Sequence, residues 1–115
     1  MSGPRLITDG EYRWDIEFCD MPDDSDPDCE GTCEKPTLDD NGHIRVRGCV
    51  PLFRLRQILM HELFHAGEYA EGVDLDHKTL DSMARYLTRL FDHNPDLVAF
   101  FTTETKRPKR KSKAR

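Results

Sequence analysis

Leucines recur at helical spacing between residues 51 and 66, which predicts a helix with one buried face. They are Leu52, Leu55, Leu59 and Leu63. Pro51 suits the first turn of such a helix, and we expect the helix to weaken near Gly67. We therefore take this segment as the central helix of the fold.

A second apolar stripe, between residues 80 and 91, predicts a helix that packs on the first. It comprises Leu80, Met83, Ala84, Leu87, Leu90 and Phe91. Asp76 is the expected N-cap, with Leu75 and Leu80 in contact across it as a hydrophobic staple. The Asn-Pro dipeptide at residues 94–95 then predicts a last short helix, capped by Asn94 and ending near residue 105.

Alternation of polar and apolar residues predicts strands in the first half of the chain. Trp14, Ile16 and Phe18 share one side of residues 13–18, and residues 6–8 are expected to pair with this strand across an Asp-Gly turn. A turn signal at residues 40–42 precedes a second strand, residues 43–47, with Ile44 and Val46 toward the core. Residues 20–40 are dense in Asp, Pro and Gly, and we expect them to form an acidic loop.

These elements predict an α+β fold in one domain, residues 1–105, with a short antiparallel sheet packed on the central helix and a second core helix. Seven of the 17 Lys and Arg residues lie in residues 106–115, which hold no acid, so the rest of the chain has a net charge of −12. We expect this basic segment to be a disordered tail. No apolar run is long enough to span a bilayer and the first residues lack the layout of a signal peptide, so we expect a cytoplasmic protein without a membrane partner.

The chain has four cysteines: Cys19, Cys29, Cys33 and Cys49. They would be free thiols in a reducing cytosol, whereas in a secreted chain they could form two disulfides. Their spacing contains one CxxxC and no CxxC pair, which matches a structural zinc site poorly. We expect ordinary thiols, and a second, structural metal site is the weaker alternative.

The central helix carries the run His61-Glu62-Leu63-Phe64-His65. Histidines four apart on a helix lie one turn above each other, so both imidazoles can reach one metal ion. Zinc accepts imidazole readily, and a catalytic zinc has three protein ligands and one position open to water. Glu62 would then take a proton from the zinc-bound water and return it to a leaving amine, as in the HExxH pattern of zinc peptidases. Coincidence is the alternative, but polar side chains on a core-facing helix need partners or a metal.

His77 and Asp81 are the candidates for the third protein ligand because they lie four apart at the start of the second helix. We favour His77 as the ligand, with Asp81 accepting a hydrogen bond from the other ring nitrogen of a coordinating histidine. Asp81 as the ligand, and His77 as an ordinary exposed residue, are the alternatives. Tyr69 and Arg85 are weaker candidates for steadying an oxyanion.

The segment HELFHAGEY, a short connection, the helix LDHKTLDSMARYLTRLF and the Asn-Pro dipeptide resemble small phage and bacterial HExxH metallopeptidases. These are gluzincin-like minimal domains related in plan to ImmA/IrrE-type peptidases, and the likeness covers about residues 40–101. The resemblance implies a zincin-like fold, Zn²⁺ and a place in the cytoplasm of a bacterial or phage-infected cell. In that group the third ligand is usually acidic, whereas here His77 stands at that position and Asp81 at the position of a bracing acid. A metzincin is not expected, because the residues after His65 do not continue as xxGxxH.

The sequence thus predicts a zinc-dependent peptidase with His61, His65 and His77 as ligands and Glu62 as the group that activates water on a peptide or protein substrate. If strand 43–47 lies at the sheet edge beside the metal, it could hold an extended peptide by main-chain hydrogen bonds, although an ordinary strand is the stronger expectation. The main alternative is a non-catalytic, zinc-stabilised module that binds a protein partner. Nucleic-acid contact by the basic tail is a weaker alternative, since the net charge of −12 opposes it.

Overall fold

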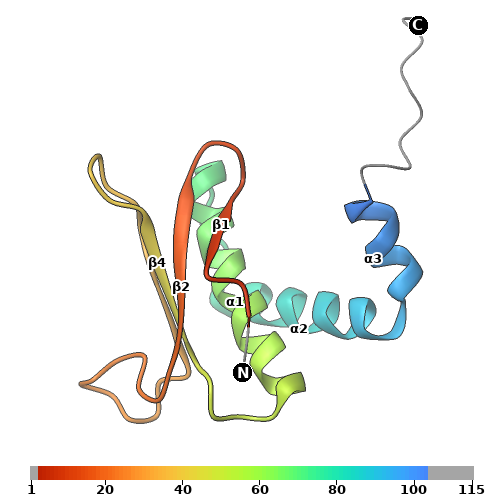
Figure 1. Ribbon diagram of the computed structural model, residues 1–115, viewed down its shortest axis with the longest axis horizontal. Helices are drawn as coiled ribbons and strands as arrows, with labels where there is room; N and C mark the ends of the chain where they lie inside the picture. Colours follow the sequence, from red (N-terminus) through yellow and green to blue (C-terminus); the bar gives the residue numbers. More distant parts are fainter. Residues whose placement is uncertain (1–2, 104–115) are drawn as a thin grey trace, which may run out of the picture.

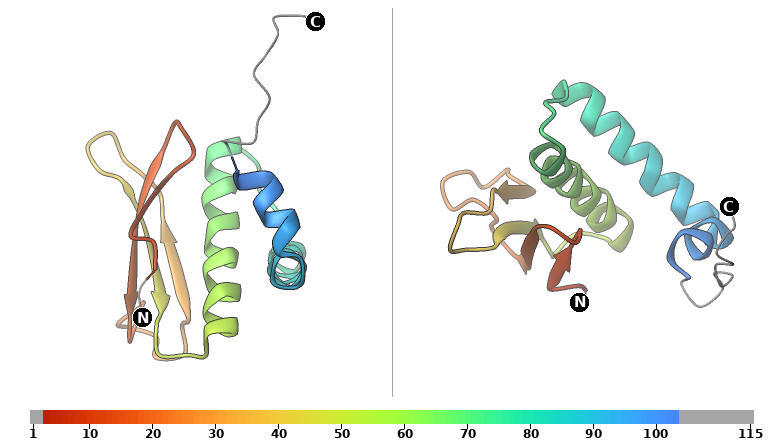
Figure 2. Two further views of the ribbon diagram at one scale, coloured as in Figure 1. Left: turned by 45° about the vertical axis from the view of Figure 1, so that its right-hand side comes forward. Right: turned by 90° about the horizontal axis from the view of Figure 1, so that it is seen from above.

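Residues 3–103, the part of the chain that the computed structural model describes, fold into a sheet and three helices. The strands are β1 (Leu6–Thr8), β2 (Arg13–Cys19), β3 (Gly31–Glu34) and β4 (Gly42–Arg47), and the helices are α1 (Leu52–Glu71), α2 (His77–His93) and α3 (Pro95–Thr102). The sheet, α1 and α2 form successive layers with α1 in the middle (Figures 1 and 2). The expected α+β class is confirmed, and the expected disordered tail lies outside the described residues.

The sheet is mixed, and the expectation of a purely antiparallel sheet is wrong. Its strand order is β1-β2-β4-β3, with antiparallel outer pairs and a parallel central pair, β2 and β4. The difference arises because the chain passes through β3 before it reaches β4. Strand β3 runs back along the sheet one strand away from β2, and β4 returns in the position between them, so it must run in the direction of β2.

Strand β3 lies inside residues 20–40, so the expectation that this whole segment is a loop is wrong. Its residues pair with β4, with Thr32 opposite Arg45 and Cys33 opposite Ile44. Strand β3 is therefore an edge strand, as β1 is at the other side of the sheet, and β4 is an interior strand with neighbours on both sides. The strand at residues 43–47 therefore does not lie at the sheet edge, which was the condition for its holding an extended peptide.

One face of the sheet packs on α1 and forms the core. The predicted alternation is confirmed, because Trp14, Ile16, Ile44 and Val46 are buried on this face. Leu55, Ile58 and Ala66 are the buried apolar residues that α1 contributes. Leu52 is exposed because it lies in the first turn of α1, beyond the core. The opposite face of the sheet is polar and includes an ion pair between Arg45 and Glu17, 3.3 Å apart.

Helix α1 continues past Gly67 and ends at Glu71, with Gly72 as its C-cap, so the expected weakening near Gly67 is wrong. Gly67 lies inside the helix with open space where a side chain would be, and its neighbours keep the helical period. Gly72 adopts the left-handed conformation, with φ 69° and ψ 32°, which favours glycine at the end of a helix.

Helix α2 begins as predicted, with the Asp76 side chain accepting a hydrogen bond from the Thr79 main-chain N–H at 3.1 Å. Leu80, Ala84 and Thr88 form its buried side, whereas Met83, expected in the apolar stripe, is half exposed. Met83 directly precedes Ala84, so its side chain lies to one side of the surface of α2 that contacts α1.

Helix α3 has Pro95 in its first turn, as predicted, and ends at Thr102 rather than near residue 105. The Asn94 side chain does not cap α3; its amide donates a hydrogen bond to the Leu90 carbonyl at 2.8 Å. That carbonyl lies in the last turn of α2, so Asn94 stabilises the end of α2 instead. In residues 3–103, no helix combines the length and apolar character needed to cross a bilayer.

Candidate metal centre

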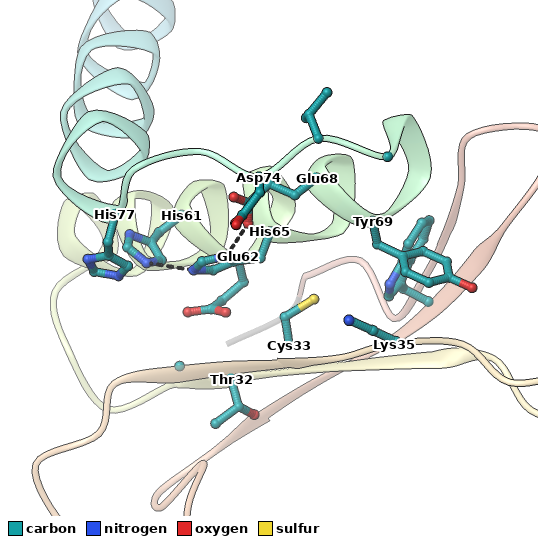
Figure 3. Close-up of a pocket in the computed structure, with 14 residues that line it drawn as sticks. Thr32, Cys33, Lys35, His61, Glu62, His65, Glu68, Tyr69, Asp74 and His77 are labelled. Atoms are coloured by element: carbon teal, nitrogen blue, oxygen red, sulfur yellow. Dashed lines mark hydrogen bonds and ion pairs between the residues drawn. The ribbon is translucent and has the colours of Figure 1, made fainter.

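Three imidazoles meet where the start of α2 crosses the middle of α1. His61 and His65 project from successive turns of α1, and His77 reaches them from α2 (Figure 3). Their potential ligand nitrogens all lie within 4.8 Å of one another. The structure therefore brings together three residues that could hold a metal ion. The four cysteines are free thiols and none belongs to this group.

Two carboxylates fix which ring nitrogens face the centre. Asp81 Oδ1 lies 3.1 Å from His61 Nδ1, and Glu68 Oε1 lies 2.7 Å from His65 Nδ1. Because an ionised carboxylate only accepts hydrogen bonds, each Nδ1 carries the proton and each Nε2 presents a lone pair. These two Nε2 atoms are 3.2 Å apart.

The separation of the two Nε2 atoms fits a shared metal ion. Two lone pairs at this distance repel each other unless a proton or a cation lies between them. Two nitrogens on one tetrahedral zinc, each bonded at about 2.0–2.1 Å, are roughly 3.3 Å apart. The donor set of neutral imidazoles is also one that zinc accepts. The residues present therefore fit Zn²⁺.

Asp81 lies beside the three-histidine group and holds one of its rings in place. Its second oxygen, Oδ2, forms an ion pair with Arg85 Nε at 3.2 Å, so the carboxylate bridges Arg85 and His61. Arg85 is thus engaged with Asp81, and not with the centre of the pocket. Burial lowers the pKa of His61 and so favours the neutral imidazole that a metal requires, while the hydrogen bond that His61 donates to Asp81 opposes this shift.

Glu68 is a supporting residue that sequence reasoning missed. Besides contacting His65, it accepts a hydrogen bond from the Leu75 main-chain N–H at 2.7 Å through Oε2. The Leu75 N–H and, after it, the His65 ring lower the pKa of Glu68. Glu68 thereby ties the α1–α2 connection to the imidazole of His65. Its position three residues after His65 on one helix was the available signal.

Glu62 is buried between α1 and β3, with 6% of its surface exposed. Its side chain points from α1 toward β3 (Figure 3). Gly31 makes this possible, because a Cβ atom there would lie 2.8 Å from Glu62 Oε2. Burial raises the pKa of Glu62 to about 7, with a smaller opposing effect of the His65 charge. A carboxyl group with this pKa can exchange a proton near neutral pH.

An open pocket of about 730 Å³ surrounds these groups. The imidazoles, Glu62 and Glu68 line it from the helices, while Thr32, Cys33 and Lys35 line it from β3 and the residue after it (Figure 3). Tyr69 lines its far end, where its ring contacts the Tyr12 ring at a centroid distance of 5.0 Å. Burial, followed by the charge of Glu62, raises the pKa of the Cys33 thiol to about 12.

The outer edge of β3 is open beside this pocket. The Arg47 N–H donates to the Glu30 carbonyl at 2.9 Å, so Glu30 and Arg47 are a hydrogen-bonded pair at the end of the β3–β4 ladder. The next N–H, that of Gly48, points the other way and donates to the Cys19 carbonyl of β2 at 2.9 Å. Hydrogen bonding in an antiparallel pair alternates from residue to residue. Gly31 and Cys33 therefore direct their main-chain N–H and C=O groups away from β4, toward the free edge.

Comparisons of the chain with protein-family models, with curated proteins and with solved structures found no match in any of the three. The resemblance to phage and bacterial HExxH metallopeptidases, the zincin-like arrangement and the cytoplasmic location thus stay predictions. What the structure adds is the geometry of the three-histidine group.

Proposed function

We propose that this protein is a zinc-dependent peptidase with Glu62 as its general base. The observation that carries the proposal is the position of Glu62, which lies next to three converging imidazoles and beneath a free strand edge. A buried carboxyl group in that place has little structural purpose of its own, since burial without a charged partner is costly. A role in proton transfer accounts for both its position and its raised pKa.

Each polar residue has a distinct role in this proposal. His61, His65 and His77 hold the metal, and Asp81 and Glu68 keep the first two rings in the tautomer that binds it. Bound zinc would polarise a peptide carbonyl and lower the pKa of a bound water molecule. The Glu62 carboxylate accepts the proton of the attacking water and then delivers it to the nitrogen of the leaving amine.

The substrate in this proposal is an extended peptide aligned on the edge of β3. The outward N–H groups of Gly31 and Cys33 and the Cys33 C=O would pair with its main chain and extend the sheet by one strand. The Gly31 C=O already accepts a hydrogen bond from Cys29 Sγ at 3.2 Å. Such pairing positions a peptide bond in the pocket without demanding a particular side chain. It also transfers to β3 the role that the sequence had suggested for the strand at residues 43–47.

The test is the substitution Glu62→Gln, which keeps the size of the side chain and removes the base. We expect the variant to bind zinc as the wild type does and to lose cleavage of a mixed peptide library monitored by mass spectrometry. Asp92→Ala is the matched control, because Asp92 pairs with Arg56 on the surface and lies outside the group. Equal cleavage by wild type and Glu62→Gln would remove Glu62 from the mechanism.

A second candidate is a non-catalytic module in which zinc stabilises the fold and the protein binds a partner. The observation favouring it is the burial of Glu62, since only 6% of its surface is exposed to solvent. The small core also makes metal binding a substantial part of the folding free energy. This candidate predicts zinc-dependent folding, no cleavage of any peptide, and no effect of Glu62→Gln on partner binding.

A further inference from the structure

A second, smaller pocket adjoins the first at Glu62. Its volume is about 220 Å³, against about 730 Å³ for the first pocket. Gly31, His61 and Glu62 line both pockets, so the two meet at the proposed general base. The remaining residues of the smaller pocket are polar or charged except for one isoleucine, and they are Glu30, Arg54, Gln57, Ile58, Asp81 and Arg85. We call this second space the arginine pocket.

The arginine pocket and the large pocket extend in opposite directions from Glu62. On α1 the arginine pocket is lined by residues that precede His61, and at β3 by Gly31 and the residue before it. Lys35 and Tyr69, which line the other end of the large pocket, come after these positions in the strand and the helix (Figure 3). Glu62 therefore lies between a long part and a short part of one cleft.

An ion pair closes the short part of this cleft. Arg54 on α1 donates hydrogen bonds to both carboxylate oxygens of Glu30, the residue directly before β3, with Nε 3.3 Å from Oε2. The pair thus spans the gap between the helix and the start of the strand. A peptide that follows the edge of β3 past Glu62 meets this wall about one residue later, whereas the large pocket is open in the other direction.

Both guanidinium groups of the arginine pocket keep hydrogen-bond donors for a ligand. Within residues 3–103, Arg54 uses three of its five N–H groups, two on Glu30 and one on Gln57 Oε1 at 3.1 Å. Arg85 Nε pairs with Asp81 Oδ2 at 3.2 Å, which fixes its guanidinium and leaves the terminal nitrogens to one side. A carboxylate is the anion whose two oxygens match the paired N–H groups of a guanidinium.

The contacts of Arg85 also place it close to the imidazoles. Asp81 accepts from Arg85 through Oδ2, while its Oδ1 lies 3.1 Å from His61 Nδ1. One carboxylate therefore separates this guanidinium from the three-histidine group. A ligand oxygen held by Arg85 would lie within about one residue of a peptide bond beside Glu62.

We propose that the arginine pocket binds the C-terminal carboxylate of the peptide, so that the protein acts as a carboxypeptidase. This inference rests on the proposed peptidase function and names its substrate class. Antiparallel pairing, the more stable arrangement, directs a peptide along β3 from Lys35 toward Gly31, with its C-terminus toward Arg54. The last residue then occupies the arginine pocket, and the preceding residues occupy the large pocket.

The reaction would release the last residue as a free amino acid. The oxygen of a water molecule forms a bond to the carbonyl carbon of the preceding residue, and the C–N bond to the last residue breaks. Glu62 accepts the proton of the water and delivers it to the nitrogen of the released amino acid. The shortened peptide ends in a new carboxylate, so it can bind in the same way and lose its next residue.

An internal peptide bond fits this cleft less well. A chain that continued past the arginine pocket would have to displace the pair between Arg54 and Glu30. A main-chain amide also offers a neutral acceptor in place of a carboxylate, and hydrogen bonds between charged groups are about twice as strong as neutral ones. The arginine pocket therefore favours a free C-terminus over an amidated one or an internal segment.

The experiment measures peptide binding and peptide cleavage separately. Binding is measured by fluorescence anisotropy with zinc-loaded Glu62→Gln protein and two N-terminally labelled peptides that differ only in a C-terminal carboxylate or amide. Arg54→Gln and Arg85→Gln, each combined with Glu62→Gln, test the two guanidiniums. Arg56→Gln is the matched control, because Arg56 lies on the same helix and pairs with Asp92 outside the cleft at 3.4 Å. Circular dichroism and zinc content verify that each variant keeps its fold and its metal.

We expect the free-acid peptide to bind at least about tenfold more tightly than the amide, because it alone pairs with the guanidiniums. Arg54→Gln and Arg85→Gln should each reduce this ratio by at least about threefold, and Arg56→Gln should keep it. Wild type should shorten the free-acid peptide one residue at a time from its C-terminus, as mass spectrometry detects.

Three results would contradict the account in distinguishable ways. Equal binding of the two peptides would overturn the carboxylate pocket. Cleavage of both peptides at the same internal bonds would also overturn it and would leave the proposed peptidase standing. A preference for the free acid in binding, without cleavage of any peptide by wild type, would contradict the peptidase and leave the arginine pocket as a carboxylate site.

Discussion

The main chain of Gly31 lies directly against the carboxylate of Glu62. A Cβ atom on Gly31 would be 2.8 Å from Glu62 Oε2 and 3.0 Å from Ile58 Cγ2, closer than packed side chains ordinarily allow. A larger residue at this position would therefore force β3 or the Glu62 side chain to shift. The same contact buries the carboxyl group and brings the free edge of β3 beside the imidazoles.

Substitution of Gly31 by alanine should displace either β3 or the Glu62 side chain. We expect Gly31→Ala to lower the free energy of unfolding by about 1–3 kcal/mol, a typical cost of overpacking. Gly67→Ala is the matched control, since its methyl group meets open space on α1, and it should raise stability by about 0.5–1 kcal/mol. Urea unfolding in the presence of a chelator measures both. A Gly31→Ala variant as stable as wild type would contradict the close contact.

The raised pKa of Glu62 makes the stability of the metal-free protein depend on pH. Burial raises the pKa of this carboxyl group from its ordinary value of 4.5 to about 7 in the folded protein. Its protonated form is favoured by folding, so the stability that the Glu62 carboxyl group contributes is fully present below pH 4.5 and is lost as pH rises through 7. The full loss is on the order of 3 kcal/mol. Glu62→Gln should remove this dependence.

The comparison between wild type and Glu62→Gln isolates this effect from other titrating groups. Urea unfolding with a chelator present should give similar stabilities for the two proteins at pH 5 and a more stable variant at pH 8. A difference between the two proteins that is the same at both pH values would show that Glu62 titrates normally.

The carboxylates behind the imidazoles should control zinc affinity. Asp81→Ala and Glu68→Ala each remove the acceptor that fixes one ring, and we expect each to weaken zinc binding by about 10- to 100-fold. Asp92→Ala, on the surface ion pair with Arg56, should leave affinity unchanged. Competition with a chromophoric chelator measures all three. Affinities indistinguishable from that of Asp92→Ala would remove Asp81 and Glu68 from the site.

The cysteines should differ widely in reactivity. Cys49 is exposed, whereas burial raises the pKa of Cys33 to about 12, and the thiolate is the reactive form. At pH 8 in the metal-free protein, we expect a fast reaction of Cys49 with a disulfide reagent and a reaction of Cys33 only upon unfolding. Cys49→Ser should abolish the fast phase. A fast phase lost in Cys33→Ser instead would contradict the buried position of Cys33.

Local patterns were sufficient to predict much of this fold. The alternation around Trp14 and Ile44 identified two strands, and the leucine spacing and the cap at Asp76 identified two helices. These features follow from interactions between residues near in sequence. The run His61-Glu62-His65 was recognisable for the same reason, since one turn of helix sets its geometry.

Features that depend on distant contacts were not predictable. Strand β3 is short and lacks alternation, and its pairing with β4 is what makes it a strand. Because β3 was not predicted, the parallel pairing of β2 with β4 was not predicted either. The role of Gly31 arises only when β3 meets α1, and Glu68 acquires its second partner, Leu75, only when the chain folds back toward α2.

The metal content of the untagged protein tests the three-histidine site most directly. Elemental mass spectrometry of wild type should give close to one zinc per chain, and His61→Ala and His77→Ala should both lose it. Retention of zinc by His77→Ala would make Asp81 the third ligand. A wild-type protein that takes up no metal after incubation with zinc would contradict the site and the proposed peptidase together.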